Sequence, residues 1–566
     1  MVFLPATARS NDSGSAQSPV VTGPEPEFLI EASETYPALE KQTLDARTSL
    51  WFAFRIFDPD TPLYHPESRA LGLSCWADLI AYKVERGVQF RLLLTDFDPV
   101  VGDVLHADTW QAVAALYNRI PGGDMQICPA LHEARTGRYV RMALAPAIYA
   151  RLRSKRNDLN GLPAAERADA YEYLPGYHRY MRLADSGQIE WRRKPTLPQI
   201  YPVTHHHKLA VFDAQTVILG GLDVNERRYD NPAHDRDSVD TWHDISLCVG
   251  GPVAIHAAQH IAGIWNMDYK AANRRMIHSR RHCPRLFGAF RTPLERLAPP
   301  ASSGDAQAGD AQAGAVRMQI VQTTSRNRRQ MGFMMRPKTV NHGLEDAHIA
   351  LIREARTLLY IETQFFRHKP LAEAMAARAR ECPDLRLIML LPAAPEEIAF
   401  DDDNGLDLRY GERLQADCIE IVREALGDRA LFVCPAKQEY RPEEGRHVVD
   451  DAPIIYVHAK VAVADDAWGI VGSANLNGRS MKWDSELGLL WQGPSAGTLR
   501  QRLAHDWIDK AAADTPLAET YDLWRETAWG NAAKPVGERR GFILPYRPEE
   551  AEAIGVNLPL LPPEIV

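Results

Sequence analysis

Residues 206–228 read HHKLAVFDAQTVILGGLDVNERR, and residues 458–480 read HAKVAVADDAWGIVGSANLNGRS. At a constant offset of 252, nine of the 23 positions are identical without a gap. A period this long is not that of a solenoid, whose units repeat every ~20–50 residues. The repeat therefore predicts that two halves of one chain each contribute half of a functional site.

The second copy has the pattern of a buried strand. Residues 454–457 (IIYV) lead into His458 and a further apolar run follows Lys460, which is typical of strands buried on both faces. Residues two apart on a strand point to the same side, so His458 and Lys460 share a face. The next strand ends in Ser473 and Asn475, in a stretch of small residues that let a ligand approach the backbone.

This combination of side chains suits a phosphate diester. A lysine supplies a full charge and an asparagine supplies donors for the non-bridging oxygens, which gain negative charge as phosphorus becomes five-coordinate. A histidine can attack phosphorus or protonate the leaving oxygen, but one histidine does not easily do both on opposite sides of the same phosphorus. The two copies supply two such sets, His206 with Lys208 and His458 with Lys460.

Each half also carries a later acid that suits the orientation of its histidine. Asp244 follows Trp242 and His243 in the first half, and Glu486 follows residues 483–485 (WDS) in the second. A carboxylate that holds Nδ1–H leaves Nε2 facing phosphorus, as the acid does in a serine protease triad. We therefore expect Asp244 and Glu486 each to orient the histidine of its own half.

The two copies resemble the signature of the phospholipase D superfamily, H-x-K-x4-D-x6-G-S/G-x-N/D. The match falls on His206, Lys208, Asp213, Gly220, Gly221 and Asp223, and again on His458, Lys460, Asp465, Gly472, Ser473 and Asn475. Two complete copies are a specific match, whereas a single H-x-K-x4-D recurs by chance. Residues 227–231 (RRYDN) and 360–366 (YIETQFF) are also similar to eukaryotic-type phospholipase D, so the resemblance covers roughly residues 28–530.

The resemblance implies a metal-independent phosphodiesterase that forms a covalent phosphohistidine and needs no cofactor. It implies phospholipase D hydrolysis of glycerophospholipids to phosphatidic acid and free headgroup, or transphosphatidylation when another alcohol replaces water. His206 is the implied nucleophile and His458 the implied acid, although the residues themselves leave this choice open. Besides the histidines and lysines, the implied catalytic residues are Asp213, Asp465, Asn475, Asp223, Asp244 and Glu486, and the implied substrate contacts are Ser473, Gly221 and Glu362.

Some of these residues also have structural interpretations. Asp213 and Asp465 lie beyond the strand of the lysines, where a turn cap or a structural salt bridge is the more common role. Glu362 fits a buried hydrogen-bonding residue equally well. Adjacent histidines on a strand point to alternate faces, so residues 205–207 (HHH) do not form one closed metal site, and no metal ligand set is expected.

Composition bounds the class of protein. The 566 residues are 45% hydrophobic and 25% charged, which is ordinary for a soluble globular chain. The formal net charge of −9 argues against general binding of nucleic acid. The seven cysteines are scattered and odd in number, which predicts free thiols. No apolar run of about 18 residues predicts a transmembrane helix.

Composition also divides the chain. Residues 1–27 predict a disordered leader and not a signal peptide. Residues 299–316 repeat Gly-Asp-Ala-Gln-Ala and predict a flexible linker between an N-terminal lobe, 28–298, and a C-terminal lobe, 317–566. In each part, short apolar runs alternate with amphipathic stretches, an α/β pattern. The predicted fold is two pseudo-symmetric α/β lobes with mixed sheets flanked by helices and the active site at their interface.

The expected partners are a phospholipid substrate and a peripheral membrane surface, for a monomer that is cytoplasmic or secreted by a signal-peptide-independent route. The candidate membrane contact is the basic segment 135–156, which contains Arg151, Arg153, Lys155 and Arg156. The same segment also fits a solvated helix face.

Three other functions remain open. A cardiolipin-synthase-like transferase would favour membrane spans near the N-terminus, and a nuclease of the superfamily usually carries one motif per chain and dimerises. A noncatalytic lipid-binding protein belongs to another class, and the intact histidines and lysines of both copies argue against it.

Overall fold

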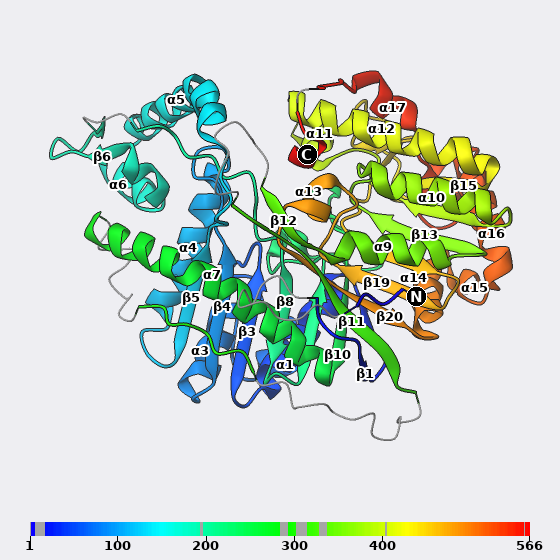
Figure 1. Cartoon of the computed structure of the whole chain (residues 1–566), viewed down its shortest axis with the longest axis horizontal. Coiled ribbons are helices and arrows are strands. Elements are labelled where there is room, and N and C mark those ends of the chain that lie inside the picture. The colour runs from blue at the N-terminus through cyan, green and yellow to red at the C-terminus, as the bar shows by residue number, and fades with distance from the viewer. Residues whose placement is uncertain are drawn as a thin grey trace.

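The structure is a computed structural model, and it describes residues 2–5, 17–192, 196–282, 293–300, 314–327, 337–401, 405–559 and 561–566. Two mixed sheets lie side by side, and each is made almost wholly by one half of the chain (Figure 1). We call them the first-half sheet and the second-half sheet.

The first-half sheet has seven strands in the order β2-β10-β9-β8-β3-β4-β5. Its strands are β2 (Glu27–Ile30), β3 (Ser49–Phe54), β4 (Gln89–Thr95), β5 (Met125–Ala130), β8 (Lys208–Phe212), β9 (Thr216–Gly220) and β10 (Ile245–Gly250). β3, β4 and β5 are parallel, and the other neighbours are antiparallel.

The second-half sheet has ten strands, with the order β1-β11-β20-β19-β18-β13-β14-β15-β21 and β12 paired to β11. Its strands are β1 (Val21–Gly23), β11 (Val316–Arg326), β12 (Lys338–His342), β13 (Leu358–Thr363), β14 (Arg386–Leu390), β15 (Ala430–Pro435), β18 (Lys460–Ala464), β19 (Trp468–Gly472), β20 (Glu486–Gln492) and β21 (Ile543–Pro545).

The repeat in the sequence is also a repeat in topology. When β1, β12 and β21 are set aside, the second-half order β11-β20-β19-β18-β13-β14-β15 matches the first-half order strand for strand. Parallel and antiparallel pairings also agree at every step. β8 and β18, which begin at Lys208 and Lys460, occupy the same central place, so the two motifs are presented by equivalent strands.

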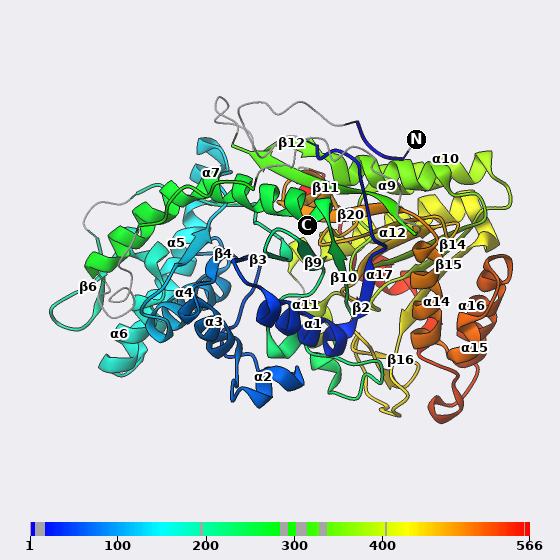
Figure 2. The ribbon, with the colours of Figure 1, turned by 90° about the horizontal axis from the view of Figure 1, so that it is seen from below.

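Helices cover both faces of the two sheets (Figure 2). On one side lie α7 (Pro252–His282), α9 (Gly343–Glu354), α10 (Lys369–Glu381) and α12 (Leu406–Leu426). On the other lie α1 (Glu31–Asp45), α3 (Trp76–Glu85), α14 (Ser495–Trp507) and α16 (Leu517–Ala532). One buried apolar cluster contains Phe52 and Leu92 as well as Val463 and Trp507, so the two halves share a core. The α/β class with mixed sheets flanked by helices is confirmed.

The described chain also contains further helices and two hairpins. They are α2 (Pro66–Ala70), α4 (Asp103–Arg119), α5 (Arg138–Gly161), α6 (Ala164–Glu172), α11 (Glu396–Phe400), α13 (Gly478–Lys482), α15 (Lys510–Ala513), α17 (Pro548–Ile554) and the hairpins β6 (Met181–Leu183) with β7 (Ile189–Trp191) and β16 (Val448–Val449) with β17 (Ala452–Pro453). None of the described helices is both long and apolar enough to cross a bilayer. Six cysteines are free, as predicted, and Cys283 lies outside the described residues.

The leader predicted over residues 1–27 belongs in part to the fold. Val2 and Phe3 are buried, and the Phe3 ring meets Trp468 edge-on at 5.1 Å between centroids. β1 pairs with β11 and β2 pairs with β10, so residues 21–30 cross from the second-half sheet to the first-half sheet. Composition cannot predict this, because the strand β11 that β1 pairs with belongs to the distant second half of the chain. Residues 1, 6–16 and 301–313, which include most of the predicted linker, lie outside the described residues.

Asp213 and Asp465 occupy equivalent turns at the ends of β8 and β18, away from the histidines. Both have a left-handed backbone, with φ of 52° and 51°. The Asp213 carboxylate accepts hydrogen bonds from the three backbone N–H groups of residues 47–49, and Asp465 accepts from those of residues 356–358. Because a five-residue strand spans about 16 Å, the structure does not support the catalytic role implied for either aspartate. They cap the chain as it enters β3 and β13.

We predict that Asp213→Asn and Asp465→Asn each lower the free energy of unfolding by about 1–2 kcal/mol, the usual cost of a weakened cap. Asparagine tolerates the left-handed backbone, so the change isolates the loss of the charged acceptor. The backbone donors hold the pKa of Asp213 below its usual value, although burial opposes them. The difference in the free energy of unfolding between wild type and Asp213→Asn, measured by urea unfolding, should therefore disappear as the pH falls below about 4. Loss of turnover at unchanged stability would contradict this assignment.

Candidate active site

The segments that precede β8 and β18 each reach across to the other half of the chain. The His206 N–H donates to the carbonyl of Ser485 at 2.8 Å, and the His458 N–H donates to the carbonyl of His243 at 2.8 Å. Isolated β-bridges accompany both bonds, between residues 205 and 485 and between residues 243 and 457. Each motif histidine is thereby fixed beside the residue that precedes the acid of the other half.

The two acids consequently contact opposite histidines. Glu486 Oε2 lies 3.1 Å from His206 Nδ1, and Asp244 Oδ2 lies 2.6 Å from His458 Nδ1. The expectation that each acid orients the histidine of its own half is wrong. The sequence shows which acids are available, but the bridges between the halves decide which histidine each acid meets.

Gly221 and Ser473 support these acids from within their own halves, so the structure does not support their assignment as substrate contacts. A Cβ on Gly221 would lie only 2.1 Å from Asp244 Oδ1, so glycine is needed to leave room for that carboxylate. At the equivalent place, the Ser473 hydroxyl donates to Glu486 Oε2 at 2.5 Å. At this motif position, glycine therefore goes with the shorter acid, Asp244, and serine goes with the longer acid, Glu486.

The two lysines are buried beside their histidines. Lys208 Nζ donates to the carbonyl of His206 at 3.3 Å, and Lys460 Nζ donates to the carbonyl of His458. Burial lowers the pKa of both lysines, and that of Lys460 falls to about 7, with Asp244 opposing the shift. An anionic ligand would reverse this effect, because it favours the charged ammonium.

Asp223 and Asn475 hold equivalent positions but play different parts. Asp223 Oδ1 accepts from the N–H of Ile56 at 2.9 Å, and its Oδ2 lies 3.6 Å from Lys208 Nζ. Asn475 Nδ2 donates to Gln364 Oε1 at 3.0 Å, and its second amide hydrogen is suited to a phosphate oxygen. The site is therefore asymmetric, with a carboxylate that neutralises a lysine in one half and an amide in the other.

The electrostatics of the site favour neutral imidazoles. Burial lowers the pKa of His206 and His458 well below the usual value, and the surrounding lysines and arginines lower it further. Burial raises the pKa of Asp244 to about 7 and of Glu486 to about 8. A diester anion would offset the cations and draw a proton onto the imidazoles, which is the form that a general acid needs.

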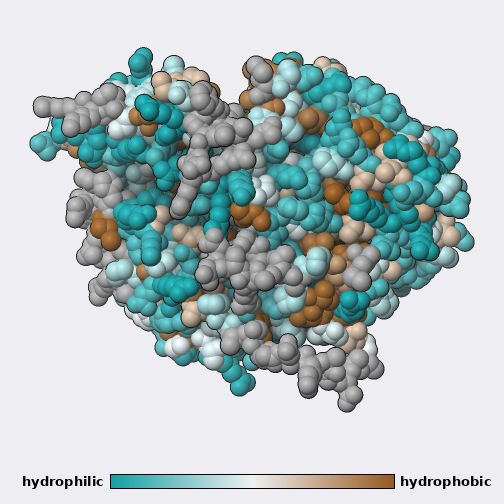
Figure 3. All heavy atoms as spheres, in the orientation of Figure 1, coloured by the Kyte–Doolittle hydropathy of each residue, from teal (hydrophilic) through white to brown (hydrophobic). Residues whose placement is uncertain are grey.

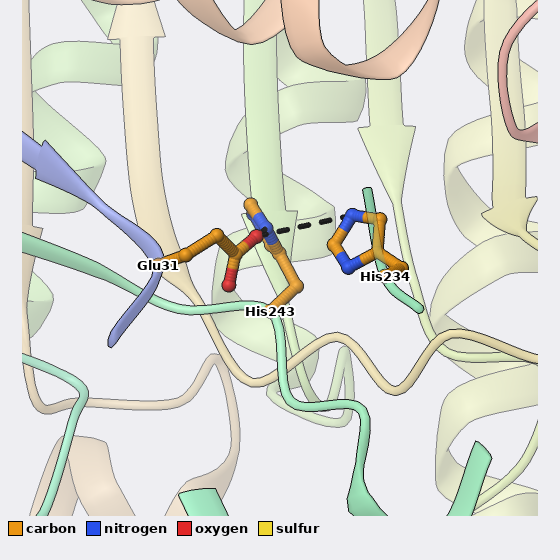
Figure 4. Close-up of side chains that lie close together, drawn as sticks. All are labelled: Glu31, His234 and His243. Carbon is orange, nitrogen blue, oxygen red and sulfur yellow. Dashed lines mark hydrogen bonds and ion pairs between the residues drawn. The ribbon is translucent and has the colours of Figure 1, made fainter. Parts of the chain in front are cut away.

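A buried group of one acid, Glu31, and two histidines, His234 and His243, lies elsewhere in the interior (Figure 4). Among the described residues, one group of histidine and acid side chains has its ligand atoms close enough together to hold a metal ion. It consists of Glu31, His234 and His243. Glu31 Oε1 is, however, in direct hydrogen-bond contact with His243 Nδ1, and the other nitrogen of that ring lies 2.8 Å from Glu362 Oε2. A metal ion at about 2.0–2.2 Å from each ligand would hold the oxygen and the nitrogen farther apart.

His243 is instead a buried imidazolium held between two carboxylates. Burial alone would lower its pKa, but Glu31 and Glu362 outweigh burial and raise the pKa well above the usual value. Glu362 also accepts from the Trp507 indole N–H at 2.8 Å and from the Tyr360 hydroxyl at 2.5 Å. Glu362 is therefore a buried hydrogen-bonding residue and not a substrate contact. It fixes the segment whose carbonyl holds His458.

The neighbours of His206 have separate partners. His205 Nε2 lies 2.7 Å from Asp268 Oδ2, and His207 Nε2 lies 2.8 Å from His260 Nε2. The rings of His205 and His207 are stacked with centroids 6.1 Å apart, so these two histidines share one face of the extended segment, as alternation predicts.

Sequence reasoning missed three arginines of the site. Arg55, Arg228 and Arg479 are each close enough to lower the pKa of one or both motif histidines. Arg479 is an identity of the repeat, and Arg228 lies in the segment that resembles phospholipase D, so the sequence did contain a signal for both. Arg55 follows the strand β3 with no motif around it, and only the fold brings it to the histidines.

Comparison with known proteins places this geometry in a family. The family model described as "Cardiolipin synthase, PLD-like domain" matches residues 348–507, which include His458, Lys460, Asn475 and Glu486. Phospholipase D1 of Schizosaccharomyces pombe is 25% identical over 424 residues, and phospholipase D2 of Bos taurus is 24% identical over 412 residues. These matches support the phospholipase D superfamily for this chain.

The alignments cover only part of these superfamily members. They span 57% of this chain and 29% of the S. pombe protein, and 63% of this chain and 41% of the bovine protein, so the chain spans less than half the length of either relative. Among solved structures, the phosphatidylserine synthase of Haemophilus influenzae superposes with a TM-score of 0.45 and 12% identity, over 92% of this chain and 96% of that one.

Proposed function

We propose that this chain is a phospholipase D, which hydrolyses glycerophospholipids through a covalent phosphohistidine. The observation that carries the proposal is the pair of His–Lys sets brought together at one place, with each histidine held at Nδ1 by an acid of the other half. Within the described residues the hydrogen bonds of both rings are made by Nδ1, so both Nε2 atoms can act on one phosphorus. The S. pombe, bovine and plant relatives, all called phospholipase D, support the eukaryotic type.

In the first step, His206 Nε2 attacks phosphorus and forms a P–N bond while the bond from phosphorus to the headgroup oxygen breaks. His458, protonated at Nε2, gives its proton to that leaving oxygen. Lys208, Lys460 and the Asn475 amide hold the non-bridging oxygens as their negative charge grows. The products are the free alcohol and phosphatidyl-His206.

In the second step, a water molecule attacks phosphorus and the P–N bond breaks. His458, now neutral, takes a proton from the water, which follows from microscopic reversibility. Phosphatidic acid leaves and both imidazoles regain their starting states. An alcohol in the place of water gives a new phosphodiester.

Transfer to a lipid alcohol is the second candidate function, because the matching family model is described as "Cardiolipin synthase, PLD-like domain". The same two histidines would carry out that reaction, with the hydroxyl of phosphatidylglycerol as the acceptor in the second step. The two functions therefore differ in the acceptor and not in the catalytic residues.

We predict headgroup release from a panel of phospholipids, and a fall of at least about 100-fold in His206→Ala and in His458→Ala. Turnover should survive EDTA, because the cations and donors of the site do the work that a metal does elsewhere. Product analysis with added phosphatidylglycerol separates hydrolysis from transfer. Loss of activity on chelation and its return with zinc or calcium would require another mechanism.

We predict that the acid variants shift different limbs of the pH profile. A carboxylate at Nδ1 favours the imidazolium, so its removal lowers the pKa of the imidazole that it contacts. Glu486→Gln should move the ascending limb, which reports deprotonation of His206, to lower pH. Asp244→Asn should move the descending limb, which reports loss of the proton from His458, to lower pH. The measurement is kcat/KM against pH. If Glu486→Gln moved the descending limb and Asp244→Asn moved the ascending limb, His458 would be the nucleophile and His206 the acid.

We further propose that α5 contacts the membrane. This helix lies beside a notch at the upper edge of a largely hydrophilic face (Figure 3). Tyr139 and Met142 are about half exposed on it. Arg151 and Arg153 are exposed, whereas Lys155 is paired with Asp103 at 2.5 Å.

The double variant Arg151→Gln/Arg153→Gln should therefore bind anionic vesicles about 10-fold or more weakly, since each lost charge costs about 1 kcal/mol at such a surface. The difference should shrink in high salt. Lys369→Gln/Arg380→Gln on α10 is the matched control, because it removes two charges from another exposed helix. Equal vesicle binding by the two double variants would contradict the assignment to α5.

A further inference from the structure

Arg228 is buried beside the histidines without a counter-charge. Its side chain is 9% exposed, and within the described residues its guanidinium forms no ion pair and its Nη1 has no hydrogen-bond partner. The guanidinium carbon lies 3.7 Å from the ring centroid of Trp242, and that ring lies 5.0 Å from the ring of His458. A buried charge that is neither paired nor hydrogen-bonded is costly, so this position favours an anionic ligand.

Arg55 is a second cation of this kind. It is partly buried, its Nε is hidden from solvent without a partner, and no described acid forms an ion pair with it. Burial lowers its pKa, Asp223 opposes the shift, and the charges of Arg228 and Arg479 add to it. The charges of Arg55 and Arg228 are therefore close enough to influence each other. Each also lowers the pKa of one motif histidine, Arg55 that of His206 and Arg228 that of His458.

The other cations of the site either have an acidic partner or are assigned to the scissile phosphate. Lys208 faces Asp223 at 3.6 Å, and Arg479 Nε donates to Asp484 at 2.8 Å. Lys460 faces the scissile phosphate together with Lys208 in the proposed mechanism. A phosphodiester carries one negative charge, so Arg55 and Arg228 exceed what the reacting group requires.

We propose that Arg55 and Arg228 form a subsite for a second anionic group, a carboxylate or a phosphate, on the headgroup or acceptor alcohol of the substrate. This inference rests on the proposed function and deepens it. The diacylglycerol side of a glycerophospholipid carries no charge, so the anion must belong to the alcohol side. The planar guanidinium binds both carboxylate and phosphate through two parallel hydrogen bonds, which suits either source.

Matched substrates test the proposal. Phosphatidylserine and phosphatidylethanolamine with the same short acyl chains differ by one carboxylate, and phosphatidylglycerol phosphate and phosphatidylglycerol differ by one phosphate. Used as monomers below their critical micelle concentration, they remove the effect of surface charge. We expect wild-type kcat/KM to favour the more anionic member of at least one pair by about 10-fold or more, the effect of one charged hydrogen bond. The pair that shows it identifies the anion.

Variants connect the preference to the arginines. In Arg55→Gln, the ratio of kcat/KM values within the preferred substrate pair should fall to within about threefold of one. Arg55→Lys should keep part of the preference, because the charge remains. Arg228→Lys should also reduce the ratio. Arg380→Gln on α10 is the matched control and should keep the wild-type ratio. A ratio is internal to each variant, so partial unfolding, which lowers both rates together, does not change it.

The outcomes separate the two proposals. Equal turnover within both pairs, or a preference for the less anionic member, would overturn the subsite while the phospholipase D function stands. A wild-type preference that Arg55→Gln and Arg228→Lys both leave unchanged would also overturn it. Failure to turn over any of the four diesters would overturn the proposed function and the subsite with it.

Discussion

The site depends on backbone pairing between the two halves of the chain. The N–H of each motif histidine is held by a carbonyl of the opposite half, at Ser485 for His206 and at His243 for His458. These bonds place Glu486 and Asp244 against the histidines that they do not accompany in sequence. Neither half therefore contains a complete histidine–acid pair, and folding of the whole chain is the condition for both.

The interior behind the site reinforces this pairing. The buried imidazolium of His243 joins Glu31, at the start of α1, to Glu362, at the end of β13, and so connects the two sheets through charge. Breaking a buried ion pair by removal of one partner is strongly unfavourable, because the other charge stays buried. The segment that carries Asp244 is thus held from both sides, which keeps its carboxylate at hydrogen-bond distance from His458.

The symmetry of the fold is broken where substrate chemistry requires it. Equivalent strands present the two histidines and the two lysines, but other equivalent positions differ. Asp223 in the first half corresponds to Asn475 in the second, and Gly221 corresponds to Ser473. One half thereby gains an acid that neutralises Lys208, and the charge of this acid also acts on Arg55, which forms no ion pair with any described acid. A symmetric site would treat the two sides of a phosphodiester alike, whereas this one offers different surroundings to the two alcohols.

The sequence by itself determined the repeat, the α/β class, the two His–Lys sets and the acids Asp244 and Glu486, because motif spacing and strand periodicity are local properties. It could not decide which acid meets which histidine, that β1 joins the sheet of the distant half, or that Glu362 lies behind the site. It also gave no signal for Arg55. Those features are contacts between residues that are far apart in the chain, and only the packing of the two sheets against each other brings them together.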